Sequence, residues 1–234
     1  MNTSGSSILR DKPLRESPPL PGAPRDPVFE RWAADGLVWL PERGMGRLHV
    51  HEAPYDAAYW EKYVGYAATE QGHKITAARV DLVRRFTDRH VVDIGIGCGA
   101  FIEARKGWTW GYDINPVAIE WLNGQNRWCD PYTQPNGVEA VSLWDTLEHI
   151  PDPAALLRNV RTWVFVSLPI VPGSGPPPLD WKHLRRDEHV FYWTHAGFIA
   201  WMDAHGFDLV EANQDEVGLG RSNIETFVMK RRAR

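Results

Sequence analysis

A glycine-rich turn marks the run VVDIGIGCGAF at residues 91–101. A short apolar segment ends in Asp93, and Gly95, Gly97 and Gly99 follow at alternate positions before an expected helix. Glycine lets the backbone turn sharply here, and the N–H groups at the start of the helix can bind a ligand. The run therefore predicts a site for a nucleoside cofactor. It also fits the looser dinucleotide pattern G-x-G-x-x-A, so on its own it leaves NAD and other adenosyl cofactors open.

An acidic residue stands where such a cofactor would place its ribose. Asp113 follows Asp93 by twenty residues and ends the second expected strand, in GYDIN. A carboxylate at that position can accept hydrogen bonds from both ribose hydroxyls. The alternative is that Asp113 only caps the helix that is expected to begin near Pro116.

A second motif, DTLEHIPDP at residues 145–153, favours one cofactor over the other. Taken with DIGIGCG, it makes the chain resemble the class I S-adenosylmethionine-dependent methyltransferases, in particular the group that includes the ubiquinone-biosynthesis O-methyltransferases. There is a looser likeness to phage-encoded methyltransferases. The resemblance covers about residues 55–232 and includes VFVSLP at 164–169 and the helix and strand at 195–211.

The resemblance implies S-adenosyl-L-methionine as the cofactor, and it implies which residues bind it. The acidic residue and the glycines of the first motif would surround the cofactor, and Asp113 would hold the ribose. Asp130 could accept a hydrogen bond from the adenine amine, although Asp130-Pro131 is equally typical of a turn. The cofactor-binding residues so implied are Asp93, Ile94, Gly95, Gly97, Gly99, Asp113, Ile114, Asp130, Asp145 and Thr146.

His149 is the candidate catalytic residue. Methyl transfer from a sulfonium is an in-line displacement, so the protein must hold the acceptor about 3–3.5 Å from the methyl carbon. A hydroxyl acceptor would benefit from a general base, and histidine suits neutral pH. Because the Glu148–His149 pair recurs in family members with different substrates, a structural role for the pair stays open.

A polar and aromatic cluster, LDWKHLRRDEHVFYW at residues 179–193, is the candidate acceptor site. Arginine suits an anionic acceptor, and aromatic side chains could form the walls of its pocket. The alternative is a solvated loop held in place by its aromatic residues. With one tyrosine from an earlier helix, the candidate substrate-binding residues are Tyr63, Trp181, His183, Arg185, His189 and Tyr192.

Several other functions lack their motifs. The Asn/Asp-Pro-Pro-aromatic run of exocyclic-amine DNA methyltransferases and the Pro-Cys nucleophile of base C5 enzymes are both missing after the fourth strand, so duplex nucleic acid is an unfavoured partner. No Tyr-x-x-x-Lys supports an NAD-dependent oxidoreductase.

We expect a small-molecule acceptor methylated at O or N. A macromolecular acceptor (protein, glycan or modified nucleotide) and a non-catalytic cofactor-binding module are the alternatives. His49 and His51 have no third ligand nearby, so no metal is expected.

The elements that position these residues alternate between strand and helix. We expect strands at 90–93, 109–113, 139–144 and 163–168, and helices from about 100, at 116–123 and near 153–159. This alternation indicates a parallel α/β sheet. The resemblance implies a Rossmann-like sheet of seven strands in the order 3-2-1-4-5-7-6, with strand 7 antiparallel and helices on both faces.

The flanking segments complete the predicted organisation. Residues 1–27 are rich in proline and read as a disordered arm; residues 28–88 would form short strands and two lid helices broken near Gly72; residues 89–232 would form the cofactor-binding domain. The 234-residue chain carries a net charge of −4, two cysteines and no long apolar run, so we expect a cytoplasmic protein without a membrane segment. The sequence does not fix the oligomeric state.

Overall fold

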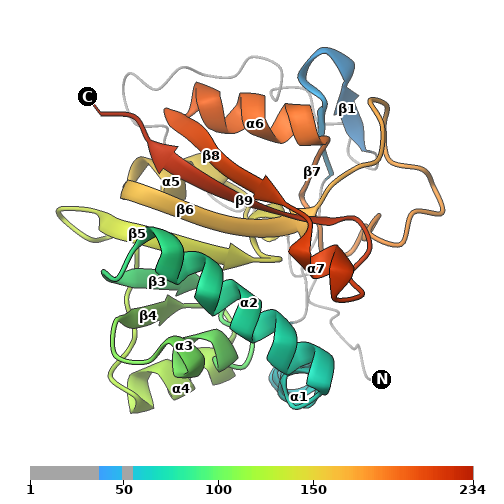
Figure 1. Cartoon of the computed structure of the whole chain (residues 1–234). Coiled ribbons are helices and arrows are strands. Elements are labelled where there is room, and N and C mark those ends of the chain that lie inside the picture. The colour runs from blue at the N-terminus through green and yellow to red at the C-terminus, as the bar shows by residue number, and fades with distance from the viewer. Residues whose placement is uncertain (1–36, 49–54, 234) are drawn as a thin grey trace, which may run out of the picture. The chain divides into compact units, whose positions relative to one another are not determined.

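The computed structural model describes residues 37–48 and 55–233. Their main feature is a six-stranded sheet in the order β4-β3-β5-β6-β9-β8 (Figure 1). The predicted arm at 1–27 and the pair His49 and His51 lie outside the described residues. The strands are β3 (Val91–Ile94), β4 (Thr109–Tyr112), β5 (Val138–Trp144), β6 (Val160–Pro169), β8 (Phe207–Asn213) and β9 (Ile224–Arg231).

The first four strands of this sheet are parallel, and β9 runs antiparallel to both of its neighbours. The predicted order of seven strands is therefore wrong in one respect within the described residues. The third strand that the resemblance implied would lie between residues 113 and 139. Only a single bridge between Gly111 and Trp128 forms there. Asp130 and Pro131 follow at once, and a proline cannot donate to a strand ladder, which explains why no pairing continues there.

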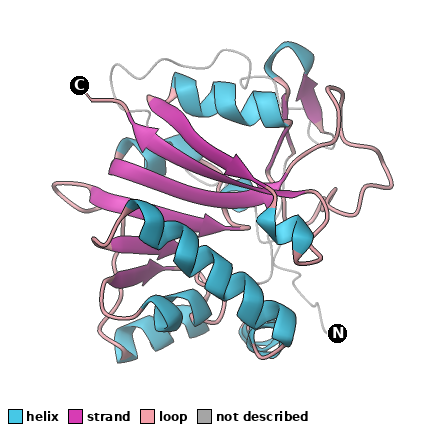
Figure 2. Cartoon of the chain, in the orientation of Figure 1, coloured by secondary structure: helices cyan, strands magenta, loops and turns pink. Residues whose placement is uncertain are grey.

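Helices cover both faces of the sheet. Helix α2 crosses one face and α5 lies behind the other (Figures 1 and 2). The helices are α1 (Ala57–Ala67), α2 (Glu70–Phe86), α3 (Ala100–Arg105), α4 (Pro116–Gly124), α5 (Pro153–Arg158), α6 (His195–Ala204) and α7 (Asp215–Gly218), with a 3-10 turn η2 at Leu147–His149. None of the described helices is long and apolar enough to cross a membrane.

Fully buried side chains hold the layers together. Val83 of α2 and Val91 and Phe165 of the sheet have almost no exposed surface and belong to one apolar cluster with Phe101 of α3. Burial of each such side chain stabilises the fold by about 1.5–3 kcal/mol. This packing holds α2 and α3 against β3, β5 and β6.

The helix break predicted near Gly72 lies three residues earlier. Thr69 separates α1 from α2, and its hydroxyl accepts a hydrogen bond from the N–H of Gly72. Gly72 itself lies in the first turn of α2, where a Cβ atom would come within 2.2 Å of the carbonyl oxygen of Tyr66. Glycine is required here for the close approach of two helices rather than for a break.

A second, three-stranded sheet joins segments that lie far apart in the sequence. It consists of β1 (Val38–Leu40), β2 (Met45–Arg47) and β7 (Phe191–Trp193), all antiparallel. A 3-10 turn, η1 (Pro41–Arg43), connects the first two strands. Residues 169–193, a segment rich in proline and glycine that we call the excursion, are therefore anchored at the end of the segment, where the last residues are buried.

Candidate functional site

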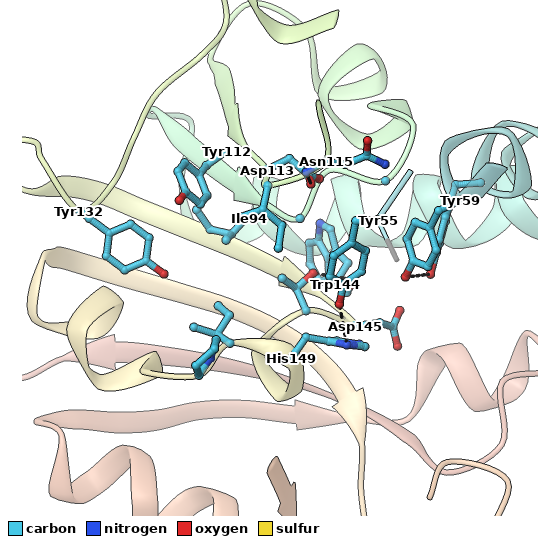
Figure 3. Close-up of a pocket in the computed structure, with 17 residues that line it drawn as sticks. Tyr55, Tyr59, Ile94, Tyr112, Asp113, Asn115, Tyr132, Trp144, Asp145 and His149 are labelled. Atoms are coloured by element: carbon cyan, nitrogen blue, oxygen red, sulfur yellow. Dashed lines mark hydrogen bonds between the residues drawn. The ribbon is translucent and has the colours of Figure 1, made fainter. Parts of the chain in front are cut away.

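Most of the predicted cofactor-binding residues lie at the carboxyl ends of β3, β4 and β5. A cavity of about 280 Å³ opens there, with Asp113 and Asn115 on one wall and Tyr55 and Tyr59 on another (Figure 3). Open α/β sheets bind ligands at this edge. We call it the first cavity. Seven of the predicted cofactor residues line it: Ile94, Gly95, Gly97, Asp113, Ile114, Asp145 and Thr146.

The glycine turn forms the floor of the first cavity. Gly95 and Gly97 have φ values of +70° and +56°, which side-chain-bearing residues rarely adopt. A Cβ atom on Gly95 would lie 2.5 Å from the Oγ1 atom of Thr146. The turn can therefore pass below a ligand only if this position is glycine. Gly99 begins α3 and faces Trp121 instead of the cavity.

Asp113 lies between the cavity and the start of α4. Its carboxylate accepts a hydrogen bond from the N–H of Asn115 at 2.8 Å, whereas the side chain of Asn115 caps the helix. Burial raises the pKa of Asp113, which backbone N–H groups partly offset. The capping alternative therefore belongs to Asn115, and Asp113 is available to a ligand.

Two tyrosines form the far end of the first cavity. The rings of Tyr112 and Tyr132 meet edge to face with centroids 5.5 Å apart (Figure 3). Ile114, which also lines this cavity, is 61% exposed. Asp130 does not line the cavity, because its carboxylate accepts the N–H of Tyr132 at 2.8 Å in a turn. Sequence analysis missed Tyr132, whose only signal is an aromatic residue placed directly after that turn.

Asp93 lies beneath the glycine turn and is 1% exposed. The hydroxyl of Ser142 donates a hydrogen bond of 2.6 Å to its carboxylate. Burial raises the pKa of Asp93 to about 7, although the Ser142 hydrogen bond and the charge of Arg79 oppose this shift. Asp93 can therefore exchange a proton near neutral pH.

A network of four charged side chains holds Asp145 in place; Glu216 is buried and the other three are partly buried. Arg221 donates to both carboxylate oxygens of Asp145 at 2.8 Å, and Arg79 donates to one of them at 3.0 Å. Both arginines also bind Glu216 of α7, which accepts a hydrogen bond from Ser167. Burial alone would raise the pKa of Asp145, but the two arginines lower it to about 2. The network fixes a residue with φ of +56° at the edge of the cavity.

His149 lies on η2, across the first cavity from Asp113 and Asn115 (Figure 3). Its Nδ1 atom is 3.0 Å from the carbonyl oxygen of Glu188 and 3.2 Å from the hydroxyl of Tyr55 (Figure 3). Burial lowers the pKa of His149 to about 4, so the imidazole is neutral at pH 7. A neutral ring that donates from Nδ1 to a carbonyl carries its lone pair on Nε2.

A second cavity of about 250 Å³ adjoins the first. The two share the residues Tyr63, Gly95, Gly97, Trp144, Asp145 and His149. Asp93 and four of the predicted substrate-binding residues line the second cavity: Tyr63, His183, Arg185 and His189. Arg185 is bound to Glu188, so it is partly neutralised.

Two predicted substrate-binding residues line neither cavity. Tyr192 is 1% exposed and donates its hydroxyl to the carbonyl of Arg185 at 3.2 Å. Trp181 packs against it in an apolar cluster with Val171. These aromatic residues anchor the excursion, as the alternative interpretation of that segment proposed.

Comparison with known proteins gives a family and a fold. Residues 63–212 match the family model described as a methyltransferase domain. No curated protein matches the chain.

Among solved structures, a chain of the Haloferax volcanii complex between the Trm112 methyltransferase activator and a methyltransferase is 15% identical, with a TM-score of 0.57, over 78% of this chain and 99% of that one. The 1,6-didemethyltoxoflavin-N1-methyltransferase of Burkholderia thailandensis is 14% identical, with a TM-score of 0.52, over 76% and 85%. The magnesium protoporphyrin IX methyltransferase of Synechocystis PCC 6803 is 14% identical, with a TM-score of 0.50, over 75% and 94%. At these identities the likeness concerns the fold.

Proposed function

The chain belongs to the methyltransferase domain family, and we propose that it transfers the methyl group of S-adenosylmethionine to an oxygen or nitrogen atom of a small-molecule acceptor. S-adenosylmethionine is the methyl donor: its sulfonium supplies an activated methyl group and a neutral thioether leaving group. Two structural neighbours, the didemethyltoxoflavin and protoporphyrin enzymes, were crystallised with S-adenosylhomocysteine.

The first cavity has the groups that an adenosyl cofactor requires. Its floor is a turn that holds Gly95 and Gly97 at positive φ, and Asp113 offers a carboxylate that could accept hydrogen bonds from a ribose. Tyr112 and Tyr132 offer aromatic surface for the adenine, in place of the hydrogen bond expected from Asp130. Asp93, beneath the turn, lines the adjoining second cavity, where a cationic ligand would favour the ionised form of its carboxyl group.

The observation that carries the acceptor proposal is the second cavity. It adjoins the first, is bounded by Tyr63 and α2 on one side and by the excursion on the other, and has a volume of about 250 Å³. Its lining is rich in charged and polar side chains, which suits a small polar acceptor. His149 lies at the boundary between the two cavities, where it can orient an acceptor atom toward the methyl group.

A fractionation experiment tests this proposal. The purified full chain would be incubated with tritium-labelled S-adenosylmethionine and one fraction of a cell extract at a time. The three fractions are the small molecules, the proteins and the nucleic acids. We expect label to move into the small-molecule fraction only. The Asp113→Ala variant serves as the control, because loss of the ribose contact should weaken cofactor binding. Labelling confined to protein or nucleic acid would overturn the proposal.

A further inference from the structure

We propose that Glu148, His149 and His189 bind a divalent metal cation at the boundary between the two cavities. Each offers one ligand atom, and these atoms lie within 4.8 Å of one another. All three side chains line the second cavity. The inference concerns the same site as the proposed function, and it rests on that function only for the role of the cation in activating an acceptor.

Glu148 is the first observation that points to a ligand. The residue is 1% exposed, and neither carboxylate oxygen has a hydrogen-bond partner among the described residues. A buried carboxylate without a partner is costly by several kcal/mol, and such groups are normally paired or coordinate a metal. Its nearest basic neighbour is the Nε2 atom of His149, 4.0 Å from Oε1. A cation between these two atoms would satisfy both.

His149 is oriented as a metal ligand usually is. Metal-binding histidines commonly donate the N–H of their other ring nitrogen to a carbonyl or carboxylate, which fixes the tautomer. The Nδ1 atom of His149 has this partner in the carbonyl oxygen of Glu188. The lone pair on Nε2 then faces Glu148. Two ligands about 2.1 Å from a tetrahedral cation are about 3.4 Å apart, so the observed 4.0 Å requires a shift of about half an ångström.

His189 brings the third ligand from a distant segment. It is 4% exposed, its Nδ1 atom has no hydrogen-bond partner among the described residues, and its ring lies edge to face with that of His149 at 4.7 Å. The N–H of Val190 donates to the carbonyl oxygen of Glu148 at 2.7 Å, which ties the two segments together beside the cluster. This backbone hydrogen bond therefore keeps the two segments that carry the three ligands close together.

The donor set indicates the class of cation. Two imidazole nitrogens and one carboxylate oxygen suit Zn²⁺, Co²⁺, Mn²⁺ or Fe²⁺ better than Mg²⁺ or Ca²⁺. Asp145 is the next carboxylate along the same turn, but it is bound by Arg79 and Arg221. It is therefore not available as a fourth ligand. Three protein ligands leave a coordination position open, as in catalytic sites.

The open position gives the cation a role in methyl transfer. A hydroxyl acceptor bound there would lose its proton to solvent more easily, because a bound cation lowers the pKa of a coordinated oxygen. The oxygen lone pair would then form the O–CH₃ bond while the S–CH₃ bonding pair stays on sulfur as a neutral thioether. His149 would act as a ligand instead of the general base expected from the sequence, and the expectation of no metal would be wrong at this site.

Cobalt binding tests the inference without any need for an acceptor. The full chain, stripped with a chelator, would be titrated with Co²⁺ and followed by visible absorption, with Zn²⁺ competition measured by calorimetry. We expect the Glu148→Gln and His189→Gln variants to lose at least about tenfold in affinity. His183→Gln is the matched control, because His183 lines the same cavity but lies outside the cluster. This variant should bind Co²⁺ with the affinity of the wild type. Calorimetric titration with S-adenosylmethionine would verify that each variant keeps its cofactor site.

Two outcomes would overturn the inference: Co²⁺ affinity that is unchanged in both cluster variants, or no Co²⁺ binding by a wild type that binds S-adenosylmethionine. Failure of the proposed function would look different. Labelling of the small-molecule fraction that persists in the presence of a chelator would support the proposed function and contradict a role for the cation in methyl transfer. Cobalt binding that depends on Glu148 and His189, with label only in macromolecules, would support the metal while removing the small-molecule acceptor.

Discussion

Replacement of Asp93 by asparagine should make the stability of the protein less dependent on pH. The carboxyl group is 1% exposed and accepts one hydrogen bond, from Ser142. Burial raises its pKa from 3.8 to about 7. The pKa of Asp93 is therefore higher in the folded state than in the unfolded state. As the pH rises from about 4 to 7, the carboxyl group ionises in the unfolded chain but stays protonated in the folded one, so the folded state loses stability over this range.

The magnitude follows from the two pKa values. One unit of pKa difference corresponds to about 1.36 kcal/mol, so the ionised carboxylate of Asp93 destabilises the folded state by about 4 kcal/mol above pH 8. About 1.5 kcal/mol of this is already present at pH 5. The asparagine side chain would keep the acceptor for Ser142 and never ionise. The variant should therefore gain about 3 kcal/mol relative to the wild type between pH 5 and pH 8.5.

Urea unfolding of both proteins at several pH values measures this difference. Contributions of other titrating groups cancel between wild type and variant when the mutation leaves them unchanged. A Ser142→Ala variant adds a second readout, because loss of the hydrogen bond should move the transition to higher pH. A difference between wild type and Asp93→Asn that stays constant from pH 5 to pH 8.5 would refute the reasoning, since it would mean that Asp93 does not titrate in this range.

Three further predictions concern the same edge of the sheet. Asp113→Ala should weaken S-adenosylmethionine binding by about 1–3 kcal/mol through lost hydrogen bonds, and it should also lower the melting temperature of the free protein, because the N–H of Asn115 loses its acceptor; calorimetry measures both. Arg221→Met leaves buried carboxylates short of a partner and should lower the free energy of unfolding by about 3–5 kcal/mol in a denaturant titration; an effect below about 1 kcal/mol would mean that the network is solvated. Gly95→Ala should abolish cofactor binding, because of the contact with Thr146, whereas Gly175→Ala, with nothing within 4 Å of the added carbon, should bind as the wild type does.

The parallel strands could be predicted because local sequence determines them. Residues 91–94 and 138–144 are apolar runs bounded by turn residues, and each forms a buried strand within one residue of its predicted limits. The third strand was expected from the family resemblance alone, and no local pattern predicted it. Whether Trp128 extends a ladder depends on the edge of β4 and on the turn that follows, which are properties of the assembled sheet. The pairing of β2 with β7 likewise joins segments about 145 residues apart.

The site was predictable only where one segment contains it. The glycine turn and Asp113 each belong to a strand and the turn after it, so spacing along the chain fixes them. Arg79 and Arg221 reach Asp145 from 66 and 76 residues away, and no periodicity links those positions. His189 meets Glu148 and His149 across about 40 residues for the same reason. Charged side chains along a helix or loop usually face solvent, so their burial here had no signal in the sequence.

The carboxyl end of β5 combines features that oppose folding. Asp145 adopts a left-handed backbone conformation, which costs of the order of 1–3 kcal/mol in a residue other than glycine. Three residues later, Glu148 is buried with neither oxygen paired among the described residues. Elsewhere in the described sheet, the buried polar side chains of Asp93, Ser142 and Ser167 have hydrogen-bond partners. A strained backbone and an unpaired carboxyl group in one turn persist only when the surrounding structure enforces them, and the Arg79–Asp145–Arg221 network does so. A cation at Glu148 should therefore stabilise the folded protein as well as bind to it, and the thermal midpoint should rise with Zn²⁺ in the wild type but not in Glu148→Gln.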